Sequence, residues 1–295
     1  TGRATSVSLI SDSMGRSSTL TWPAPAKLNL MLRVVGRRAD GYHLLQTVFQ
    51  FLDYGDRLSF RLRNDARVQR DRPLAGVPEA SDLVLRAASL LRQRTGYRGG
   101  VDIGLEKRLP MGGGLGGGSS DAATVLLVLN RLWECGLDTE ALCALGRRLG
   151  ADVPVFVQGH TALAQGIGDD LAPVSLGRRH YVLVFPGVHI STADVFSDPG
   201  LKRDSQPCDR DIALRGCGRN DCEAVVRERF PMFHRAMQAL EQWGEPHMTG
   251  TGSGIFIPMN DEKSAKSAAQ SIKSLYNVRA VQGVDISPLH AKLDC

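Results

Sequence analysis

The sequence lacks several features that would each point to a particular class of protein. No apolar run reaches the roughly 20 residues that a membrane-spanning helix needs, which argues against an integral membrane protein. The six cysteines contain no CxxC pair, and no cluster of cysteine and histidine has zinc-finger spacing. Neither an internal repeat nor a low-complexity tract is present. We therefore expect reduced thiols in a cytosolic protein and no metal site made of cysteines.

The composition that remains is typical of a soluble globular protein. Of the 295 residues, 42% are hydrophobic and 23% are charged, and the length suffices for two domains or one large one. The net charge of +5 and the isoelectric point near 9.0 are mildly basic. Such a charge suits a phosphate-rich ligand and equally a nucleic acid, so it does not decide between them.

The beginning of the chain differs from the rest. Residues 1–20, TGRATSVSLISDSMGRSSTL, are rich in serine and arginine and lack the apolar core of a signal peptide. They fit a transit-peptide remnant, or added residues or an extension ahead of Met14. We expect a disordered extension over 1–20, a first domain over 21–170 and a second over 171–295, because the character of the sequence changes near residues 165–178.

Hydrophobic spacing predicts a mixture of helices and strands. Residues 27–36 and 58–62 alternate apolar with other side chains, as strands do, and the Asp40-Gly41 turn lies between them. Further strands are predicted over 101–109, 181–187 and 278–284. Helices are predicted from a cap at Ser81 to Gly96, from the glycine-rich stretch to about Leu132, over residues 142–150 with Gly150 at the end, and over 261–276.

The stretch PMGGGLGGGSSDAATVLLVLN, Pro110–Asn130, is the most informative part of the sequence. Six glycines fall within seven positions, and an apolar pattern at helical spacing follows. Glycine costs backbone entropy, so such density marks a loop that something approaches closely. Free N–H groups and the positive end of the following helix suit an anion, and the two serine hydroxyls suit phosphate or Mg²⁺. The predicted phosphate-binding residues are Pro110, Met111, Gly112, Gly113, Gly114, Leu115, Gly116, Gly117, Gly118, Ser119 and Ser120.

Other interpretations of this loop fit the sequence less well. Gly112, Gly114 and Gly117 match the dinucleotide pattern GxGxxG, but a second helix follows where a parallel strand should come. The Walker pattern requires a lysine that this loop does not contain. A flexible linker would not run directly into an apolar helix. We favour phosphate binding, and nicotinamide binding or a purely structural loop are the alternatives.

Several blocks of the sequence resemble one family of enzymes. PMGGGLGGGSSDAA resembles the phosphate loop of the GHMP kinases, which include galactokinase and the homoserine, mevalonate and phosphomevalonate kinases. PAPAKLNLMLRVVGRRADGYHLLQTVFQFLDYGD closely resembles the start of one branch, the 4-diphosphocytidyl-2-C-methyl-D-erythritol kinase family. GADVPVFVQGHTALAQGIGD and TGTGSGIF follow in that family's order, so the resemblance covers about residues 21–285. It departs from the pattern at Asp121, where many relatives carry asparagine.

The resemblance implies a fold, a reaction and a setting. The fold would be α+β: a GHMP kinase fold with an ATP-binding N-terminal domain like ribosomal protein S5 domain 2 and a ferredoxin-like C-terminal substrate domain. ATP, with Mg²⁺, would phosphorylate the 2-hydroxyl of a cytidyl diphosphate sugar alcohol, giving the 2-phosphate and ADP in non-mevalonate isoprenoid synthesis. Small molecules would be the partners, without nucleic acid or membrane. A bacterial cytoplasm, rather than a plastid, and a monomer or weak homodimer are implied.

Two charged residues are the catalytic candidates by resemblance. Asp152, in GADVPVF, would be the general base that takes the hydroxyl proton. Lys27, in the apolar strand AKLNL, would lie beside it, keep it ionised and stabilise charge on the moving phosphoryl group. The plainer interpretations are a helix-capping aspartate and a lysine on the surface of an edge strand.

The substrate-binding candidates lie in two parts of the chain. Asn29 shares a strand face with the candidate lysine, and a polyol contact and a purely structural role fit it equally well. By resemblance, Tyr42 would stack on the cytosine ring and His43 would hydrogen-bond its edge, although spacing alone favours surface-loop residues. Phe196 would close the other side of the ring, with Thr192 as a polar contact. The substrate would then bind between the two domains.

Two further features are less specific. Thr249–Gly254, TGTGSG, fits either a second anion-holding turn or a turn that leads into a strand. The arginines at Arg61, Arg63, Arg67 and 147–148 are more typical of solvated faces than of ligand sites.

Rival functions come from the same superfamily and from a different class. A mevalonate- or homoserine-type kinase has an acceptor with no base to stack on the DGYH block. An RNA-binding module would predict a contiguous arginine face and salt-sensitive RNA binding. That second interpretation leaves the glycine-rich loop and the lysine–aspartate pair without a role.

Overall fold

The computed structural model describes residues 20–215 and 218–295, and every structural statement below refers to these residues. Its strands are β1 (Thr21–Arg37), β2 (His43–Arg63), β3 (Val68–Arg70), β4 (Gly100–Glu106), β5 (Ala162–Gln165), β6 (Asp170–Pro173), β7 (Arg179–Phe185), β8 (His247–Met248), β9 (Ile255–Met259) and β10 (Asn277–Val284). Its helices are α1 (Leu83–Thr95), α2 (Gly117–Leu132), α3 (Thr139–Arg147), α4 (Val153–Gln158), α5 (Thr192–Ser197), α6 (Arg210–Leu214), α7 (Asp221–Arg229), α8 (Pro231–Leu240), α9 (Glu262–Ile272) and α10 (Pro288–Leu293), with short 3-10 turns η1 (Glu79–Ser81) and η2 (Glu241–Trp243).

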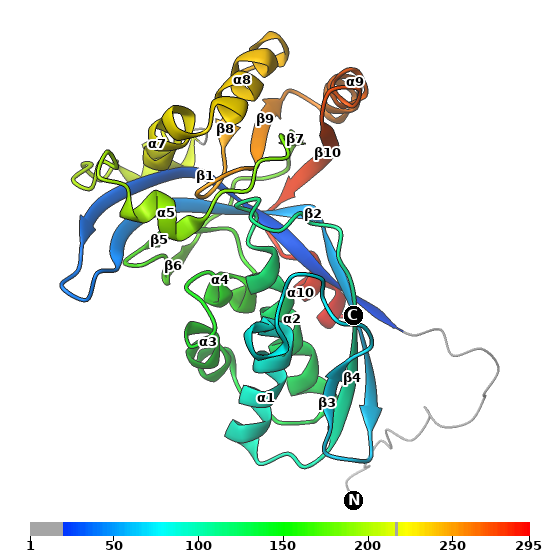
Figure 1. The fold of residues 1–295 in the computed structure, drawn as a ribbon. Coiled ribbons are helices and arrows are strands. Elements are labelled where there is room, and N and C mark those ends of the chain that lie inside the picture. Colours follow the sequence, from blue (N-terminus) through cyan, green and yellow to red (C-terminus); the bar gives the residue numbers. More distant parts are fainter. Residues whose placement is uncertain (1–19, 216–217) are drawn as a thin grey trace, which may run out of the picture.

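One mixed sheet runs through the whole molecule (Figure 1). Its paired strands follow the order β3-β4-β2-β10-β7-β9-β8, while β1 pairs with β2, and β5 pairs with β2 and β6. Helices α1 to α4 pack together in one half, and α7, α8 and α9 lie with β7 to β10 in the other. This arrangement confirms the predicted α+β class.

The predicted alternation near Lys27 forms the long hairpin of β1 and β2. Its antiparallel pairing runs from Thr21 opposite Ser59 to Arg37 opposite His43. β2 is also paired with β4 near its end, with β10 at its middle and with β5 closer to its start. Both halves of the molecule are therefore built on the same strand.

The three largest buried groups of side chains hold the sheet and helices together. Burial of such apolar surface is the main favourable term in folding. The first half is packed around Leu58, Leu91, Leu126, Leu129 and Phe156. The second half is packed around Val182, Val226, Phe233, Ile257 and Ile272. Between them, a third group joins the central strands through Leu28, Leu30, Leu52, Tyr181 and Phe256.

Several element boundaries differ from the sequence prediction. The cap of α1 is Asp82, whose Oδ1 accepts a hydrogen bond from Val84 N at 2.9 Å, and Ser81 ends η1 instead. Gly96 ends α1 as predicted, with φ 72°. α3 ends at Arg147, earlier than the predicted Gly150. The short strands β5 and β6 and the helices within 188–220 were not predicted, because they are too short for a periodic signal.

The domain boundary, the N-terminal extension, membrane-spanning helices and the cysteines were also subjects of prediction. The division at 170/171 falls in the β5–β6 hairpin and stays a prediction. Of the predicted extension, residues 1–19 lie outside the described residues, as does Cys217. Among the described residues, no helix combines the length and apolarity needed to cross a membrane. The described cysteines are free thiols: Cys135, Cys143, Cys208, Cys222 and Cys295.

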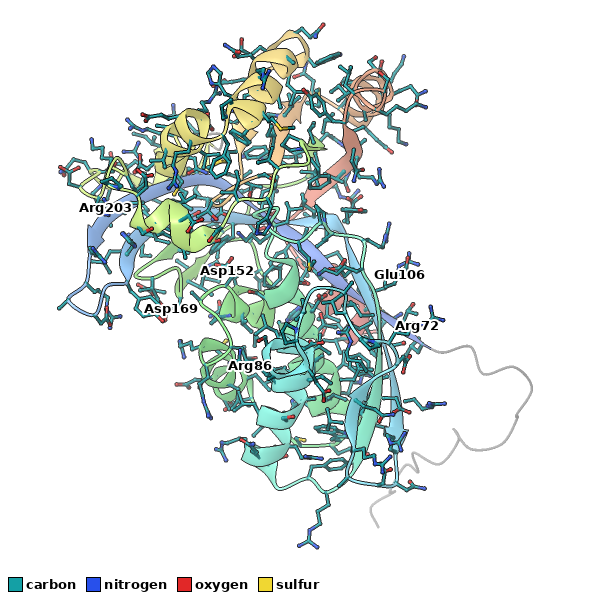
Figure 2. The ribbon with its side chains drawn as sticks, viewed as in Figure 1. Arg72, Arg86, Glu106, Asp152, Asp169 and Arg203 are labelled. Atoms are coloured by element: carbon teal, nitrogen blue, oxygen red, sulfur yellow. The ribbon has the colours of Figure 1, made fainter. Side chains whose placement is uncertain are left out.

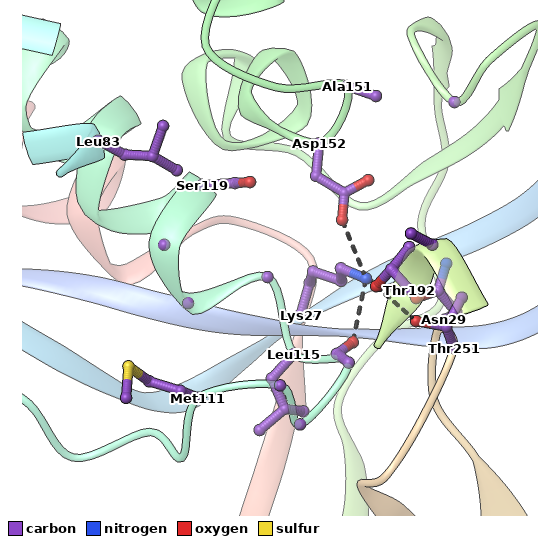
Figure 3. Close-up of a pocket in the computed structure, with 18 of the residues that line it drawn as sticks. Lys27, Asn29, Leu83, Met111, Leu115, Ser119, Ala151, Asp152, Thr192 and Thr251 are labelled. Atoms are coloured by element: carbon purple, nitrogen blue, oxygen red, sulfur yellow. Dashed lines mark hydrogen bonds and ion pairs between the residues drawn. The ribbon is translucent and has the colours of Figure 1, made fainter. Parts of the chain in front are cut away.

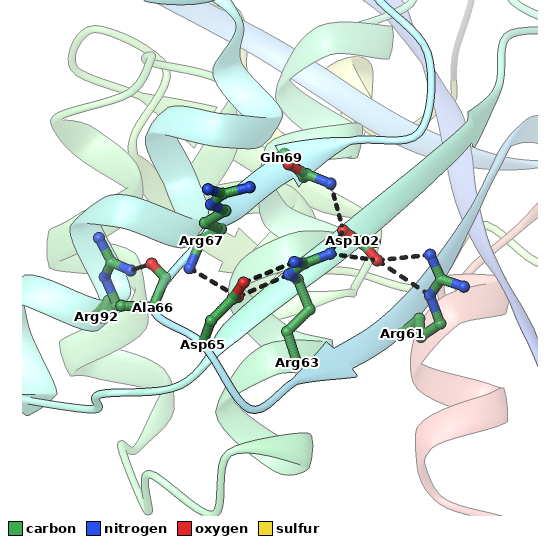
Figure 4. Close-up of polar contacts among 8 residues, drawn as sticks. All are labelled: Arg61, Arg63, Asp65, Ala66, Arg67, Gln69, Arg92 and Asp102. Carbon is green, nitrogen blue, oxygen red and sulfur yellow. Dashed lines mark hydrogen bonds and ion pairs between the residues drawn. The ribbon is translucent and has the colours of Figure 1, made fainter.

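The arginines of β2 are engaged with a buried carboxylate (Figure 4). Arg61 and Arg63 both pair with Asp102 of β4, at 2.7 and 2.9 Å, and Gln69 donates to the same side chain at 2.9 Å. Burial opposes the charge on Asp102, but these hydrogen bonds outweigh it and hold its pKa below the ordinary value. Arg67 lies close by, where its backbone N–H donates to Asp65. The cluster braces the outer face of β2 and β4.

Candidate active site

A cavity of about 930 Å³ lies beside the glycine-rich loop. Its lining comes from β1, the start of β2, the segment from β3 to α1, the glycine-rich loop, and α5. Figure 2 shows Asp152, one of its residues, between the two halves of the molecule. The predicted site residues that line it are Lys27, Asn29, Tyr42, His43, Pro110, Met111, Gly112, Gly113, Gly114, Leu115, Gly116, Gly117, Gly118, Ser119, Asp152, Thr192 and Phe196.

The glycine-rich loop needs glycine for its backbone shape. Gly112, Gly114 and Gly116 have φ values of 73°, 69° and 71°, a region that other residues rarely adopt. A Cβ atom on Gly114 would lie 2.1 Å from the carbonyl oxygen of Thr249. Gly116 is the N-cap of α2, so the loop delivers the chain directly to the first turn of that helix. The N–H groups of that turn have no partner within the helix, as an anion site requires.

The turn Thr249–Gly254 supports the glycine-rich loop from the other half of the molecule. Ser253 N donates to Gly112 O at 3.0 Å, and Gly254 N donates to Gly113 O at 3.2 Å. The turn leads into β9, as one of the two interpretations of the sequence expected. It also supports the glycine-rich loop through these two hydrogen bonds.

The two serines at the start of α2 have different surroundings. Ser119 lines the cavity, and Figure 3 shows it on the same side of the cavity as Leu83. Ser120 is buried, and its Oγ donates to Pro25 O at 2.7 Å. The predicted phosphate contact of Ser120 is therefore corrected: its hydroxyl holds α2 to β1 and does not line the cavity.

Lys27 and Asp152 face each other across the cavity (Figure 3). Lys27 Nζ lies 3.3 Å from Asp152 Oδ2. Asp152 occupies the N-cap position of α4, yet its side chain makes no capping hydrogen bond and is directed to the lysine. The lysine is 3% exposed and the aspartate 35%, so the pair has a buried cation and a carboxylate that a ligand can reach.

The ammonium group of Lys27 is held in place by further contacts. It donates to Asn29 Oδ1 at 2.5 Å and to Gly114 O at 3.1 Å. The ring of Phe49 lies beneath it, with its centroid 5.2 Å from Nζ. The lysine thereby joins β1, the glycine-rich loop and α4 at one point.

Asn29 is fully engaged by groups that the sequence did not reveal. Its Nδ2 donates to Thr47 Oγ1 at 2.9 Å, and its backbone N–H donates to Thr249 Oγ1 at 2.9 Å. Its Oδ1 accepts from Lys27, so this side chain orients the lysine. Two threonines from distant parts of the chain gave no signal in the sequence, because only the fold brings them to β1.

Aromatic residues gather at the other end of the cavity. The rings of His43 and Phe196 stack with centroids 4.9 Å apart, while Tyr42 is 58% exposed at the rim. Burial lowers the pKa of His43, and the charges of Arg203 and Arg37 lower it further. Nearby, the hydroxyls of Thr192 and Thr251 are hydrogen-bonded at 2.9 Å. The predicted aromatic group is thus brought together, with His43 stacked on Phe196.

Lys107 is a cavity residue that sequence reasoning missed. Its Nζ lies 2.6 Å from Asp56 Oδ2 and 2.9 Å from Asp121 Oδ2. Burial opposes its charge, but the two carboxylates outweigh burial and raise its pKa. Burial raises the pKa of Asp121 to about 7; Lys107 acts against this rise, and Asp56 adds to it. Lys107 lies only a few residues before the glycine-rich loop in the sequence. This position is the signal that could have identified it.

An apolar wall completes the cavity on the side of α1. It consists of Leu74, Val77, Leu83 and Leu105. The cavity therefore has an apolar end, a glycine-rich centre with the lysine–aspartate pair, and an aromatic end. An elongated ligand set with two ring systems and charged groups between them would fit this order.

Comparisons with known proteins agree with this arrangement. The model of the GHMP kinases N terminal domain matches residues 82–160. The chain is 51% identical over 275 residues to a 4-diphosphocytidyl-2-C-methyl-D-erythritol kinase from Halorhodospira halophila, covering 92% of this chain and 96% of the relative. It is 48% identical over 278 residues to a protein of the same name from Pseudomonas aeruginosa strain PAO1, covering 94% and 99%.

Solved structures extend the comparison. The crystal structure of a 4-(cytidine 5'-diphospho)-2C-methyl-D-erythritol kinase has a TM-score of 0.79 and 35% identity, and the match covers 90% of this chain and all of that one. A mevalonate kinase structure has a TM-score of 0.66 at 13% identity, with 90% and 100% coverage, which shows a shared fold only.

Proposed function

The chain belongs to the 4-diphosphocytidyl-2-C-methyl-D-erythritol kinase family of GHMP kinases, and we propose that it transfers the γ-phosphoryl group of ATP to the 2-hydroxyl of that substrate. The products would be the 2-phosphate and ADP. The observation that carries the proposal is the Lys27–Asp152 pair, 3.3 Å apart beside the loop that leads into α2. A reaction of this kind supports a place in isoprenoid precursor synthesis and in the bacterial cytoplasm.

The nucleotide would lie along the loop and the apolar wall. The triphosphate meets the backbone of Gly112–Gly118 and the first turn of α2, whose N–H groups and dipole favour negative charge. The adenine ring would fit against Leu74, Val77 and Leu83, of which Leu83 lies next to that turn. Phosphoryl transfer depends on such positioning and on charge stabilisation more than on covalent chemistry.

The residues near the phosphates fit a magnesium ion that arrives with ATP. Mg²⁺ prefers oxygen ligands and is usually bound by few protein groups together with phosphates and water. Ser119 presents a hydroxyl to the cavity, and Asp121 has a buried Oδ1 without a hydrogen-bond partner in the described structure. Ser119 and Asp121, which both line the cavity, would hold the ion, which would neutralise charge between the phosphates.

The acceptor would lie between the pair and the aromatic end. Asp152 is exposed enough to contact a hydroxyl and take its proton as the phosphoryl group moves. Lys27, fixed by Asn29, would pair with that carboxylate and balance charge on the transferring oxygens. The cytosine would bind at Tyr42, His43 and Phe196. The adenine of ATP and the cytosine of the acceptor would then occupy separate positions in the cavity.

An ADP-release assay tests the proposal. The purified chain is given ATP, Mg²⁺ and one of three acceptors: the cytidyl diphosphate substrate, mevalonate or homoserine. ADP release with the cytidyl substrate alone is the expected result. Release with mevalonate or homoserine but not with the cytidyl substrate would overturn the substrate assignment.

A further inference from the structure

The candidate base site contains a hydrogen bond whose direction is fixed by chemistry. Arg203 Nε donates to Nε2 of His43 at 3.1 Å. A guanidinium group has only donors and stays protonated at any physiological pH, so the imidazole nitrogen that faces it must be the acceptor. Neutral imidazole has one acceptor and one donor nitrogen. The proton of neutral His43 must therefore reside on Nδ1.

The arginine is rigidly mounted on the segment that carries the other ring of this site. Its Nη2 donates to Phe196 O at 2.9 Å and to Asp198 O at 2.6 Å, and its Nη1 donates to Leu201 O at 3.0 Å. Three carbonyl groups thus fix the guanidinium plane at the end of α5. Figure 2 shows Arg203 near the end of the molecule where α5 lies over the β1–β2 hairpin.

The stacked rings bring both walls of the base site to the same arginine. His43 belongs to β2 and Phe196 to α5, and the two rings are 4.9 Å apart. Arg203 contacts the side chain of the first and the backbone of the second. It therefore sets the orientation of one ring relative to the other.

We propose that Arg203 is a positioning residue that locks His43 in the Nδ1–H tautomer, so that His43 offers the base a hydrogen-bond donor. This inference rests on the proposed function only for the identity of the base. A fixed donor selects a ring edge that presents an acceptor. Cytosine has an unprotonated N3, whereas uracil carries a hydrogen there, so the lock favours a cytidyl over a uridyl diphosphate.

The charges around His43 also keep the ring neutral. Arg203 from the segment after α5 and Arg37 from β1 both disfavour imidazolium, in addition to burial. A protonated ring would lose its acceptor nitrogen and with it the contact to the guanidinium. The lock therefore holds across neutral pH.

The first test needs no substrate. Nitrogen-15 NMR of the full chain, assigned with His43→Gln, reports which ring nitrogen of His43 carries the proton at pH 7.5. We expect a protonated Nδ1 and an unprotonated Nε2 in the wild type. Arg203→Met should lose this pattern and raise the pKa of His43, and Arg203→Lys should restore it, because an ammonium group can also donate to Nε2. A protonated Nε2 in the wild type would overturn the proposal.

The second test separates positioning from general support of the fold. In Arg203→Met we expect the KM for the cytidyl substrate to rise about tenfold, as loss of one hydrogen bond implies, with kcat changed less than twofold. The preference over the uridyl analogue should shrink by a similar factor. Lys202→Met, at the exposed neighbouring position, is the control and should behave as wild type.

The outcomes distinguish this inference from the proposed function. Inactivity of the wild type toward the cytidyl substrate would overturn the proposed function and leave the tautomer measurement to decide on the lock. If Arg203→Met has the unfolding temperature of the wild type and still keeps the proton of His43 on Nδ1, then Arg203 does not fix the tautomer and the proposal is wrong. If Arg203→Met does not fold, the wild-type tautomer and Arg203→Lys still decide the matter.

Discussion

Lys27 Nζ and Asp152 Oδ2 lie 3.3 Å apart, although one residue belongs to β1 and the other to the start of α4. The contact is made next to Gly114, whose carbonyl oxygen accepts from the same ammonium group. A carboxylate, a cation and the backbone of the glycine-rich loop thus meet at one point.

Asp152→Asn should remove the general base and leave the fold intact. The carboxylate is 35% exposed and does not cap α4, so its loss costs little stability. We expect kcat to fall about 10²–10⁴-fold, as for loss of a positioned base. Steady-state ADP release measures the effect, and circular dichroism checks the fold. Asp169→Asn, a surface carboxylate paired with Arg147, is the matched control; equal turnover in both variants would reject the assignment.

Lys27→Met should abolish charge stabilisation while an apolar side chain of similar length fills the place beside the ring of Phe49. Loss of a positioned charge donor lowers kcat by about 10²–10³-fold. Asn29 Oδ1 then loses its partner, so we also expect a stability loss of about 1–3 kcal/mol. Urea unfolding and ADP release measure the two effects. Turnover near that of the wild type would show that the lysine has no catalytic role.

Gly114→Ala should separate the glycine-rich loop from the turn that braces it. The new Cβ would collide with Thr249 O at 2.1 Å in a backbone of φ 69°. We expect the KM for ATP to rise and stability to fall by more than the roughly 1–3 kcal/mol of a strained backbone alone. Gly136→Ala is the control, since its φ is 67° and nothing lies within 4 Å of a Cβ there. Equal effects of the two variants would contradict the clash.

Phe196→Ala should weaken binding of the cytidyl substrate without affecting ATP. Stacking of a base on an aromatic ring contributes about 1–3 kcal/mol, so the KM for the cytidyl substrate should rise about tenfold. The KM for ATP serves as the internal control, because the apolar wall lies at the opposite end of the cavity. A proportional rise of both KM values would place Phe196 outside the base site.

Asp121→Asn should stabilise the protein at pH 8 more than at pH 5. The pKa of Asp121 is raised from 3.8 to about 7, chiefly by burial, so the folded state holds a proton that the unfolded state releases between these values. The contribution of Asp121 to stability therefore falls as the pH rises from about 4 to 7, and the penalty persists above that range. Asparagine cannot ionise, so this contribution to the pH dependence should vanish. Thermal unfolding of Asp121→Asn and of the wild type measures the effect at both pH values. If the stability difference between the two proteins is the same at pH 5 and pH 8, the raised pKa of Asp121 is refuted.

The sequence predicted those parts of the site that have a local pattern. Glycine density with a following helix predicted the loop that lines the cavity and leads into α2, and strand alternation located Lys27 on β1. The roles of Lys27, Asp152 and the aromatic residues came from resemblance to a family, because spacing alone favoured surface positions for several of them. These roles stay predictions, which the variants above test.

The sequence could not predict the partners that hold these residues. Thr47 and Thr249 meet Asn29 only because β1, β2 and the turn before β9 converge. Ser120 looks like its neighbour Ser119, yet one helical step turns its hydroxyl toward Pro25 and away from the cavity. Arg203 lies in a polar loop without periodicity, so only tertiary structure shows that it contacts His43.

The shared strand β2 has a mechanical consequence. Rotation of one half of the molecule against the other would shear the ladder that joins β2 to β1, β4, β5 and β10. We therefore expect the framework around the cavity to keep its shape while surface segments such as α5 and the stretch before α1 adjust to the reactants. Heat should likewise melt both halves in one step, because neither can lose its strands while the other keeps its own.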